Sequence, residues 1–150
     1  MMLSRLVAGG FGTGMVPFAP GTVASATAIA LGALLLSVSP WLLAAAAVAA
    51  TAGGYFAIRA ARVEGDPGWV VIDEIAGQFI TLLSLPHVTP LGLGLAFVLF
   101  RILDITKPGP VGWADRRPGA VGIMADDVIA GLMAACLLMV VRYSYLHAEI

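Results

Sequence analysis

Residues 23–58 read VASATAIALGALLLSV, then SP, then WLLAAAAVAATAGGYFAI. The two apolar runs, Val23–Val38 and Trp41–Ile58, are each about as long as a helix needs to cross the hydrocarbon core of a bilayer, or slightly shorter. They show no alternation of polar and apolar positions, so a membrane β-barrel is not indicated. Since lipid offers no partner for open backbone groups, the runs predict membrane helices joined by a tight turn.

Three further apolar stretches follow, at Val70–Leu85, Leu91–Ile105 and Val128–Val141. A segment bounded by prolines, residues 86–90, separates the first two of these, and Lys107-Pro108-Gly109-Pro110 opens a loop that we expect to reach about Ala125. The sequence therefore predicts an all-α, polytopic membrane helical bundle with four to five membrane-embedded helices, formed by residues 1–150 as a single domain. The stretches at 70–85 and 91–105 carry acidic residues, so either of them could be re-entrant.

The composition also indicates a membrane protein. Hydrophobic residues make up 60% of the chain and charged residues 11%, and the mean hydropathy is +0.98. Ordinary soluble domains are about 45–50% apolar and about 25% charged, so a disordered chain, a coiled coil and a typical cytosolic enzyme are excluded. The net charge of -1 gives no reason to expect a nucleic-acid partner. The single cysteine, Cys136, excludes an internal disulfide and a Cys-rich zinc site.

The charged residues are distributed unevenly between the two ends of the predicted helices. Arg142 lies on one side, whereas the other side carries the remaining basic residues outside the helices: Arg5, Arg59, Arg62, Lys107, Arg116 and Arg117. The positive-inside rule makes this second side cytoplasmic. The first residues lack the order of a signal peptide, so we expect a retained, cytoplasmic N-terminus. The acidic residues, except Glu149, fall on or near the same side, which indicates a working polar face there.

Five carboxylates lie at the edges of the apolar stretches: Asp73, Glu74, Asp104, Asp126 and Asp127. An acidic residue at the centre of a membrane helix costs about 2.5–3.5 kcal/mol on insertion scales, and less near the helix ends. Any single one can be explained as an N-cap or as a partner of a helix dipole. Five together would repel one another, and a divalent cation would relieve the repulsion. Ligands that are all oxygen indicate magnesium or manganese rather than zinc.

Two of the acid pairs stand in similar local sequences, Asp73-Glu74-Ile75-Ala76-Gly77 and Asp126-Asp127-Val128-Ile129-Ala130-Gly131. We expect both pairs at the start of a helix, where the helix dipole favours negative charge. The glycine one turn later leaves room for a neighbouring helix or a ligand. Either chance or an internal duplication explains the similarity.

Arg101 and Lys107 lie on either side of Asp104 in the segment Phe100–Pro108. Arg101 and Asp104 are about one helical turn apart and share a face of the helix. They would form an intrahelical ion pair, with Lys107 extending from the helix end, or the two basic residues would hold an anion beside the metal. Carboxylates, a divalent cation and two basic side chains suit phosphoryl chemistry.

The N-terminal segment is rich in glycine and hydroxyl groups. Gly9-Gly10-Phe11-Gly12-Thr13-Gly14 is followed by Pro17, Pro20-Gly21-Thr22 and Ser25. Glycine-rich backbone before a helix can hold a phosphate, and in a membrane protein it can equally serve helix packing. The Gly-Lys-Ser/Thr of a P-loop is missing.

Several routes to phosphate hydrolysis are excluded. The sequence has no Cys-x5-Arg of a cysteinyl phosphatase and no Asp-x-Asp-x-Thr/Val of an aspartyl-phosphate enzyme. A histidine nucleophile is not supported, because His87 and His147 are predicted on the side opposite to the acids. Metal-assisted hydrolysis by water remains.

Three blocks of the sequence stand out together. They are Gly12-Thr13-Gly14 with Pro17, Pro20-Gly21-Thr22 and Ser25; Val71-Ile72-Asp73-Glu74 with Gly77; and Phe100-Arg101, Asp104-Ile105, Lys107-Pro108, Pro110, Asp115-Arg116, Gly122-Ile123-Met124, Asp126-Asp127 and Ala130-Gly131. The blocks resemble the phosphatidylglycerophosphatase A family over residues 12–131, and the third is long and specific. Two departures, Ala24 and Pro118-Gly119-Ala120, are expected in loops and leave the charged residues intact.

The resemblance implies a magnesium-dependent phosphatase of the bacterial inner membrane, surrounded by membrane lipids. It would convert phosphatidylglycerophosphate to phosphatidylglycerol and inorganic phosphate on the cytoplasmic side. The predicted catalytic residues are Asp73, Glu74, Asp104, Asp126 and Asp127, with Mg2+ on Asp73, Glu74, Asp126 and Asp127. The predicted substrate-binding residues are Arg101, Lys107, Thr13, Gly14, Thr22 and Ser25.

Two other classes of membrane protein use similar residues. A divalent-cation transporter would also place carboxylates in helices, but nearer the midplane and with access from both sides. A phosphatidyl-group transferase would also use membrane-edge aspartates and a metal, but its Asp-Gly…Ala-Arg…Gly…Asp…Asp spacing is not found in this sequence. The transporter is therefore the alternative to the phosphatase.

Overall fold

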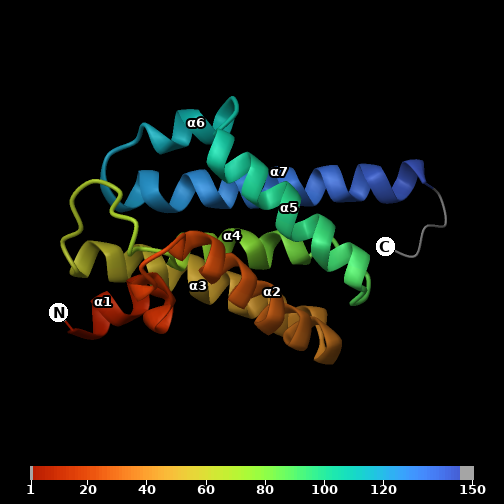
Figure 1. Ribbon diagram of the computed structural model, residues 1–150, viewed down its shortest axis with the longest axis horizontal. Coiled ribbons are helices and arrows are strands. Elements are labelled where there is room, and N and C mark those ends of the chain that lie inside the picture. The colour runs from red at the N-terminus through yellow and green to blue at the C-terminus, as the bar shows by residue number, and fades with distance from the viewer. Residues whose placement is uncertain (1, 146–150) are drawn as a thin grey trace.

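The computed structural model describes residues 2–145, and every regular element within them is helical (Figure 1). The elements are α1 (Met2–Ala8), the 3-10 helix η1 (Gly10–Met15), α2 (Pro20–Val38), α3 (Pro40–Ala60), α4 (Ile72–Leu82), α5 (Pro90–Thr106), α6 (Pro110–Asp115) and α7 (Gly119–Ser144). The predicted all-α class is thereby confirmed. The predicted positions of His147 and Glu149 lie outside the described residues.

Prolines and hydroxyl caps determine where several helices begin. A proline occupies one of the first positions of α2, α3, α5 and α6, where a missing backbone N–H costs nothing: Pro20, Pro40, Pro90 and Pro110. The hydroxyl of Ser39 accepts a hydrogen bond from the amide of Trp41 at 3.2 Å. The hydroxyl of Thr89 likewise accepts one from the amide of Gly92 at 3.0 Å. Both contacts satisfy amides that the first turn leaves without a helical partner.

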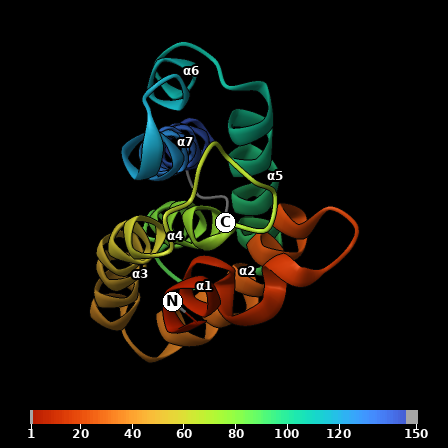
Figure 2. The same ribbon diagram turned by 90° about the vertical axis from the view of Figure 1, so that its left-hand side faces the viewer.

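The short helix α4 forms the centre of the bundle. Figure 2 shows it surrounded by α2, α3, α5 and α7, and all of its residues except Glu74 and Ile80 are buried. Figure 1 shows α1, the α3–α4 loop and the α6–α7 connection together at its left-hand side. We call this the polar end, defined by residues 4–14, 59–71 and 107–119. At the opposite end, the guanidinium of Arg142 donates to the carbonyl of Ser84 at 2.8 Å.

Three helices in the described residues are long and apolar enough to cross a membrane: α2 with 19 residues, α3 with 21 and α7 with 26. The other two apolar stretches form shorter helices, α4 with 11 residues and α5 with 17. At about 1.5 Å per residue, α4 covers roughly half of a hydrocarbon core that is about 30 Å thick. The presence of four to five membrane-embedded helices therefore stays a prediction. Length and composition support three membrane-spanning helices among the described residues.

The structure corrects two predicted boundaries. The loop expected from Lys107 to about Ala125 contains α6, and α7 already begins at Gly119. The side chains of Ile123 and Met124 are buried in the bundle, and this packing stabilises helix well before the apolar run at Val128. As a result Asp126 and Asp127 lie about two turns inside α7, and not at a helix start as expected.

The expectation that the two family departures lie in loops is wrong for three of their four residues, Ala24, Gly119 and Ala120. α2 begins at Pro20, so Ala24 is a fully buried helical residue. Ala120 lies in the first turn of α7 and is buried as well. Both changes therefore affect helix packing and not loop conformation.

The helices α4 and α7 cross at a pair of glycines. A Cβ atom on Gly131 would collide with the carbonyl oxygen of Gly77, and a Cβ atom on Gly77 would meet the carbonyl oxygen of Asp127. The hydroxyl of Thr81 donates to the carbonyl of Gly77 at 2.9 Å and lies 3.3 Å from that of Gly131. Small residues at such a crossing allow two backbones to approach closely. The two similar sequence segments therefore pack against each other.

Gly131→Ala should lower the thermal stability of the purified protein. The added methyl group has backbone atoms of Gly77 in its way, and overpacking of this kind costs about 1–3 kcal/mol. Gly53→Ala is the matched control, because nothing lies within 4 Å of a Cβ atom there. In the middle of a helix this control should be neutral or slightly stabilising. Equal melting temperatures for the two variants in detergent would contradict the proposed crossing.

Candidate active site

Three carboxylates meet where α4 and α7 cross. One oxygen atom each from Asp73, Glu74 and Asp127 lies within 4.8 Å of the others. Asp73 and Glu74 occupy the first turn of α4 as predicted, and Asp127 comes from α7. Asp73 and Asp127 each precede the crossing glycine of their helix by four residues, so the close approach of Gly77 and Gly131 brings their side chains together. We call Asp73, Glu74 and Asp127 the carboxylate cluster.

The carboxylate cluster is buried and short of positive charge. Asp73 is 6% exposed and Asp127 is 3% exposed. Burial, followed by the charges of Glu74 and Asp127, raises the pKa of Asp73 well above its ordinary value. Burial also raises the pKa of Glu74 to about 7. The Oε2 atom of Glu74 is buried and has no hydrogen-bond partner among the described residues. A buried oxygen without a donor, in a site made only of carboxylates, fits a hard divalent cation.

Arg101 joins three helices beside the cluster. Its Nη1 atom pairs with Asp104 one turn further along α5 and lies 3.9 Å from Oε1 of Glu74. Its Nη2 atom lies 3.5 Å from the hydroxyl of Thr22 on α2. The predicted intrahelical ion pair with Asp104 is therefore present, and Asp104 is only 9% exposed. The same guanidinium also approaches Glu74 on α4. The sequence of α5 alone does not predict this contact.

Lys107 forms a second cationic group, at the end of α5. Its ammonium lies 2.8 Å from Oδ1 of Asp115 and also pairs with Oδ2 of Asp126. Partial burial alone would lower the pKa of Lys107, but hydrogen bonds to Asp115 and Asp126 raise it above its ordinary value, so the ammonium stays charged. Asp126 was predicted as a metal ligand together with the other acids. Here it faces Lys107 and is not among the three carboxylates that could share one ion.

The four predicted substrate-binding residues of the N-terminal segment differ in their contacts. Thr22 contacts Arg101. Ser25 is fully buried, and its hydroxyl donates to the carbonyl of Gly21 at 2.8 Å. Thr13 donates to the carbonyl of Gly10 at 3.0 Å. A Cβ atom on Gly14 would collide with the backbone of Trp69, so this glycine is needed for close packing. Within residues 2–145 no hydrogen bond joins Thr13 or Gly14 to the cluster, and their contact with substrate stays a prediction.

Two further residues of the site did not appear in the predicted set. A Cβ atom on Gly21 would collide with Oε1 of Glu74 and would lie 3.3 Å from Nη1 of Arg101. Glycine at this position therefore allows the start of α2 to approach the acids. Asp115 shares Lys107 with Asp126. Both residues belong to the three sequence blocks that resemble the family. Their place in these blocks was the signal that could have identified them as site residues.

The arrangement places negative and positive groups side by side next to the polar end. The carboxylate cluster can hold a divalent cation, while Arg101 and Lys107 offer N–H donors that suit a phosphate group. Neither cation is free of acids, because Arg101 pairs with Asp104 and Lys107 with Asp115 and Asp126. These partners hold the two basic side chains in place. Chemically, this set of groups is suited to an anionic ester beside a divalent cation.

Comparisons with known proteins identify a family of phosphatases. The family model of phosphatidylglycerophosphatase A matches residues 6–142. A phosphatidylglycerophosphatase A of Escherichia coli K12 is 39% identical over 146 residues, which cover 94% of this chain and 84% of the relative. The enzyme of the same name from Haemophilus influenzae is 36% identical over 144 residues, 93% of this chain and 88% of the relative.

A third relative bears a different name. A protein of Bacteroides thetaiotaomicron, whose name provisionally describes it as a phosphatidylinositol-3-phosphatase, is 38% identical over 157 residues, 94% of either chain. No solved structure matches the chain.

Proposed function

The chain belongs to the phosphatidylglycerophosphatase A family and is a phosphatase of a lipid substrate, and from this premise we propose that it hydrolyses the terminal phosphate monoester of phosphatidylglycerophosphate. The products are phosphatidylglycerol and inorganic phosphate. The observation that carries the proposal is the position of Arg101, whose guanidinium contacts Thr22, Asp104 and Glu74 at the edge of the carboxylate cluster. Neither the family nor the named relatives of this chain support the alternative function, that of a divalent-cation transporter.

Mg2+ is the proposed cofactor, held by Asp73, Glu74 and Asp127. The buried Oε2 atom of Glu74 without a donor and the all-oxygen set of ligands support this choice. When bound, the ion supplies Lewis-acid chemistry and neutralises charge on the phosphate. We keep Asp126 in the catalytic set through its pair with Lys107 and not as a ligand of the ion.

The chain's own side chains then bind and orient the substrate. Arg101 presents a planar fork of donors to the phosphate oxygens, while Asp104 and Thr22 hold its guanidinium in position. Lys107 adds a point charge at the end of α5. A terminal monoester offers more charged oxygens to these groups than the internal diester, which is also crowded by its second ester arm. Orientation of the head group by the lipid chains contributes to the rate.

We further propose that the enzyme lies in the bacterial inner membrane with the polar end in the cytoplasm. The three apolar helices α2, α3 and α7 support a membrane location. The basic residues at the polar end support its orientation by the positive-inside rule. In this position the acyl chains of the substrate remain in the bilayer while its phosphate meets the site.

The test is phosphate release by the purified full chain in detergent, with phosphatidylglycerophosphate and Mg2+. We expect inorganic phosphate and phosphatidylglycerol in equal amounts, no activity with chelator, and recovery when Mg2+ is restored. Phosphatidylinositol 3-phosphate serves as a second monoester substrate, because one relative is named as a phosphatase of that lipid. Faster cleavage of that lipid would replace the proposed substrate, and no release from either lipid would overturn the enzymatic proposal.

Cysteine labelling in intact cells should place the whole polar end on one side of the membrane. The exposed residues Glu64 and Arg116 lie at the polar end and the exposed His87 near the opposite end. In a Cys136→Ala background, a membrane-impermeant thiol reagent added from outside should label His87→Cys and leave Glu64→Cys and Arg116→Cys unlabelled. Labelling of Arg116→Cys but not Glu64→Cys from outside would contradict the shared side.

A further inference from the structure

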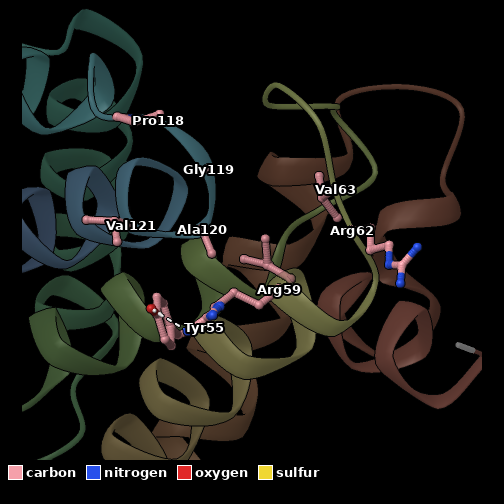
Figure 3. Close-up of a pocket in the computed structure, with 9 residues that line it drawn as sticks. Tyr55, Arg59, Arg62, Val63, Pro118, Gly119, Ala120 and Val121 are labelled. Carbon is pink, nitrogen blue, oxygen red and sulfur yellow. Dashed lines mark hydrogen bonds between the residues drawn. The ribbon is translucent and has the colours of Figure 1, made fainter.

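Two adjoining cavities lie between α3 and α7, on the side of α7 that faces away from α5. The first is a pocket of about 320 Å³ between the end of α3 and the first turn of α7 (Figure 3). The second is a groove of about 730 Å³ lined by α3, α4 and α7. Tyr55 and Val121 line both of them, so the pocket and the groove are adjacent. We call them the Arg59 pocket and the α3–α7 groove.

The α3–α7 groove is apolar and has the length of one membrane leaflet. It extends from Ala44 to Phe56 on α3 and from Val121 to Leu132 on α7. At about 1.5 Å per residue this is about 16–18 Å, close to half of a hydrocarbon core about 30 Å thick. Thr51 does not make the groove polar, since its hydroxyl donates to the carbonyl of Ala47 at 2.8 Å. Because α3 and α7 are both candidate spans, the groove runs along the direction of a lipid acyl chain.

A positive charge lies at the polar end of this groove. The Nη1 atom of Arg59 donates to the hydroxyl of Tyr55 at 3.2 Å, and the guanidinium carbon lies 5.6 Å from the centre of the Tyr55 ring. Figure 3 shows the Arg59 side chain extending toward Tyr55 and the Arg62 side chain pointing away from it. Neither arginine forms an ion pair within residues 2–145. No acidic residue lines the pocket or the groove.

We propose that the Arg59 pocket and the α3–α7 groove together bind one anionic diacyl phospholipid, with its phosphate on Arg59 and an acyl chain in the groove. Charge complementarity selects the head group, because the pocket offers a guanidinium that no acid neutralises. The leaflet-long apolar groove, aligned with two candidate spans, selects an acyl chain. The site is separate from the carboxylate cluster, since none of Asp73, Glu74 and Asp127 lines either cavity. The lipid is a bound component of the enzyme and not its substrate.

The first test is native mass spectrometry of the full chain in detergent with added phosphatidylserine or phosphatidylcholine of identical acyl chains. We expect a complex with one lipid that forms more tightly with phosphatidylserine. Arg59→Gln should weaken binding of phosphatidylserine about tenfold, the loss that follows from removing one charge-assisted hydrogen bond. Arg116→Gln is the matched control, because it removes the same charge from an exposed side chain that lines neither cavity. Equal losses in both variants, or equal binding of the two lipids, would overturn the proposal.

The second test fills the groove. Ala52 lines the α3–α7 groove, whereas Ala49 is an exposed alanine of the same helix that does not. Ala52→Phe should abolish the lipid complex and Ala49→Phe should retain it, with circular dichroism showing that both variants keep the helical content of the parent. Retention of the lipid in Ala52→Phe would overturn the groove assignment. A dimer without lipid that is lost in Ala52→Phe would assign the groove to a second copy of the chain instead.

Discussion

Asp127→Asn should lower the rate of phosphate release at least about 100-fold, the scale expected when metal-assisted catalysis is lost. Asp127 is the contribution of α7 to the carboxylate cluster, and the amide removes one of the negative charges that would hold Mg2+. Asp73→Asn should have an effect of similar size. The measurement is the rate of phosphate release at increasing Mg2+ concentration. Both variants should need more Mg2+ for half of their maximal rate than the parent protein does.

Asp126→Asn separates the two roles that the adjacent acids have in our proposal. We also expect about a 100-fold lower rate for this variant, because Lys107 loses one of the two acids that position it and misplacement of a binding group costs on this scale. Its Mg2+ requirement should stay that of the parent, since Asp126 is not a member of the cluster. The exposed loop residue Glu64 provides the control, and Glu64→Gln should change neither quantity. An unchanged Mg2+ requirement in Asp127→Asn would contradict the proposed ligand set.

Arg101→Lys should lower the rate about 100-fold or more, which is the cost of losing one well-placed donor to a developing charge. The guanidinium of Arg101 contacts Thr22 and Asp104 and approaches Glu74 at the same time. A lysine ammonium is a single point on a flexible stem and cannot reproduce this fork. Phosphate release at saturating lipid measures the effect, and we expect a lower kcat together with a higher KM.

Arg142→Lys is the matched control for Arg101→Lys. Arg142 donates to the carbonyl of Ser84 at the opposite end of the bundle, so its replacement should leave kcat and KM nearly unchanged. Circular dichroism of both variants would show that the helices remain. Near-normal kinetics for Arg101→Lys would mean that Arg101 serves only as the structural partner of Asp104.

The sequence by itself determined the class of structure and the family. Long apolar runs interrupted by prolines dictate helices, because a bilayer requires internal backbone hydrogen bonds and proline is tolerated mainly in the first turn. Acids at the edges of these runs, next to Arg101 and Lys107, indicated a metal and an anion. The three blocks indicated the family, which the match over residues 6–142 shows. Each of these features is local, so each can be found without knowing which helices are neighbours.

The tertiary structure decided which acids lie together and which pair with Lys107. Asp126 and Asp127 are adjacent in sequence, but successive residues of a helix point about 100° apart, so they must face different neighbours. The crossing of α4 and α7 at Gly77 and Gly131 turns Asp127 toward Asp73 and leaves Asp126 to Lys107. The helical period alone does not predict which neighbour each of these two acids faces. The neighbour depends on where two helices distant in sequence touch, and on the early start of α7 at Gly119, which packing and not hydropathy fixes.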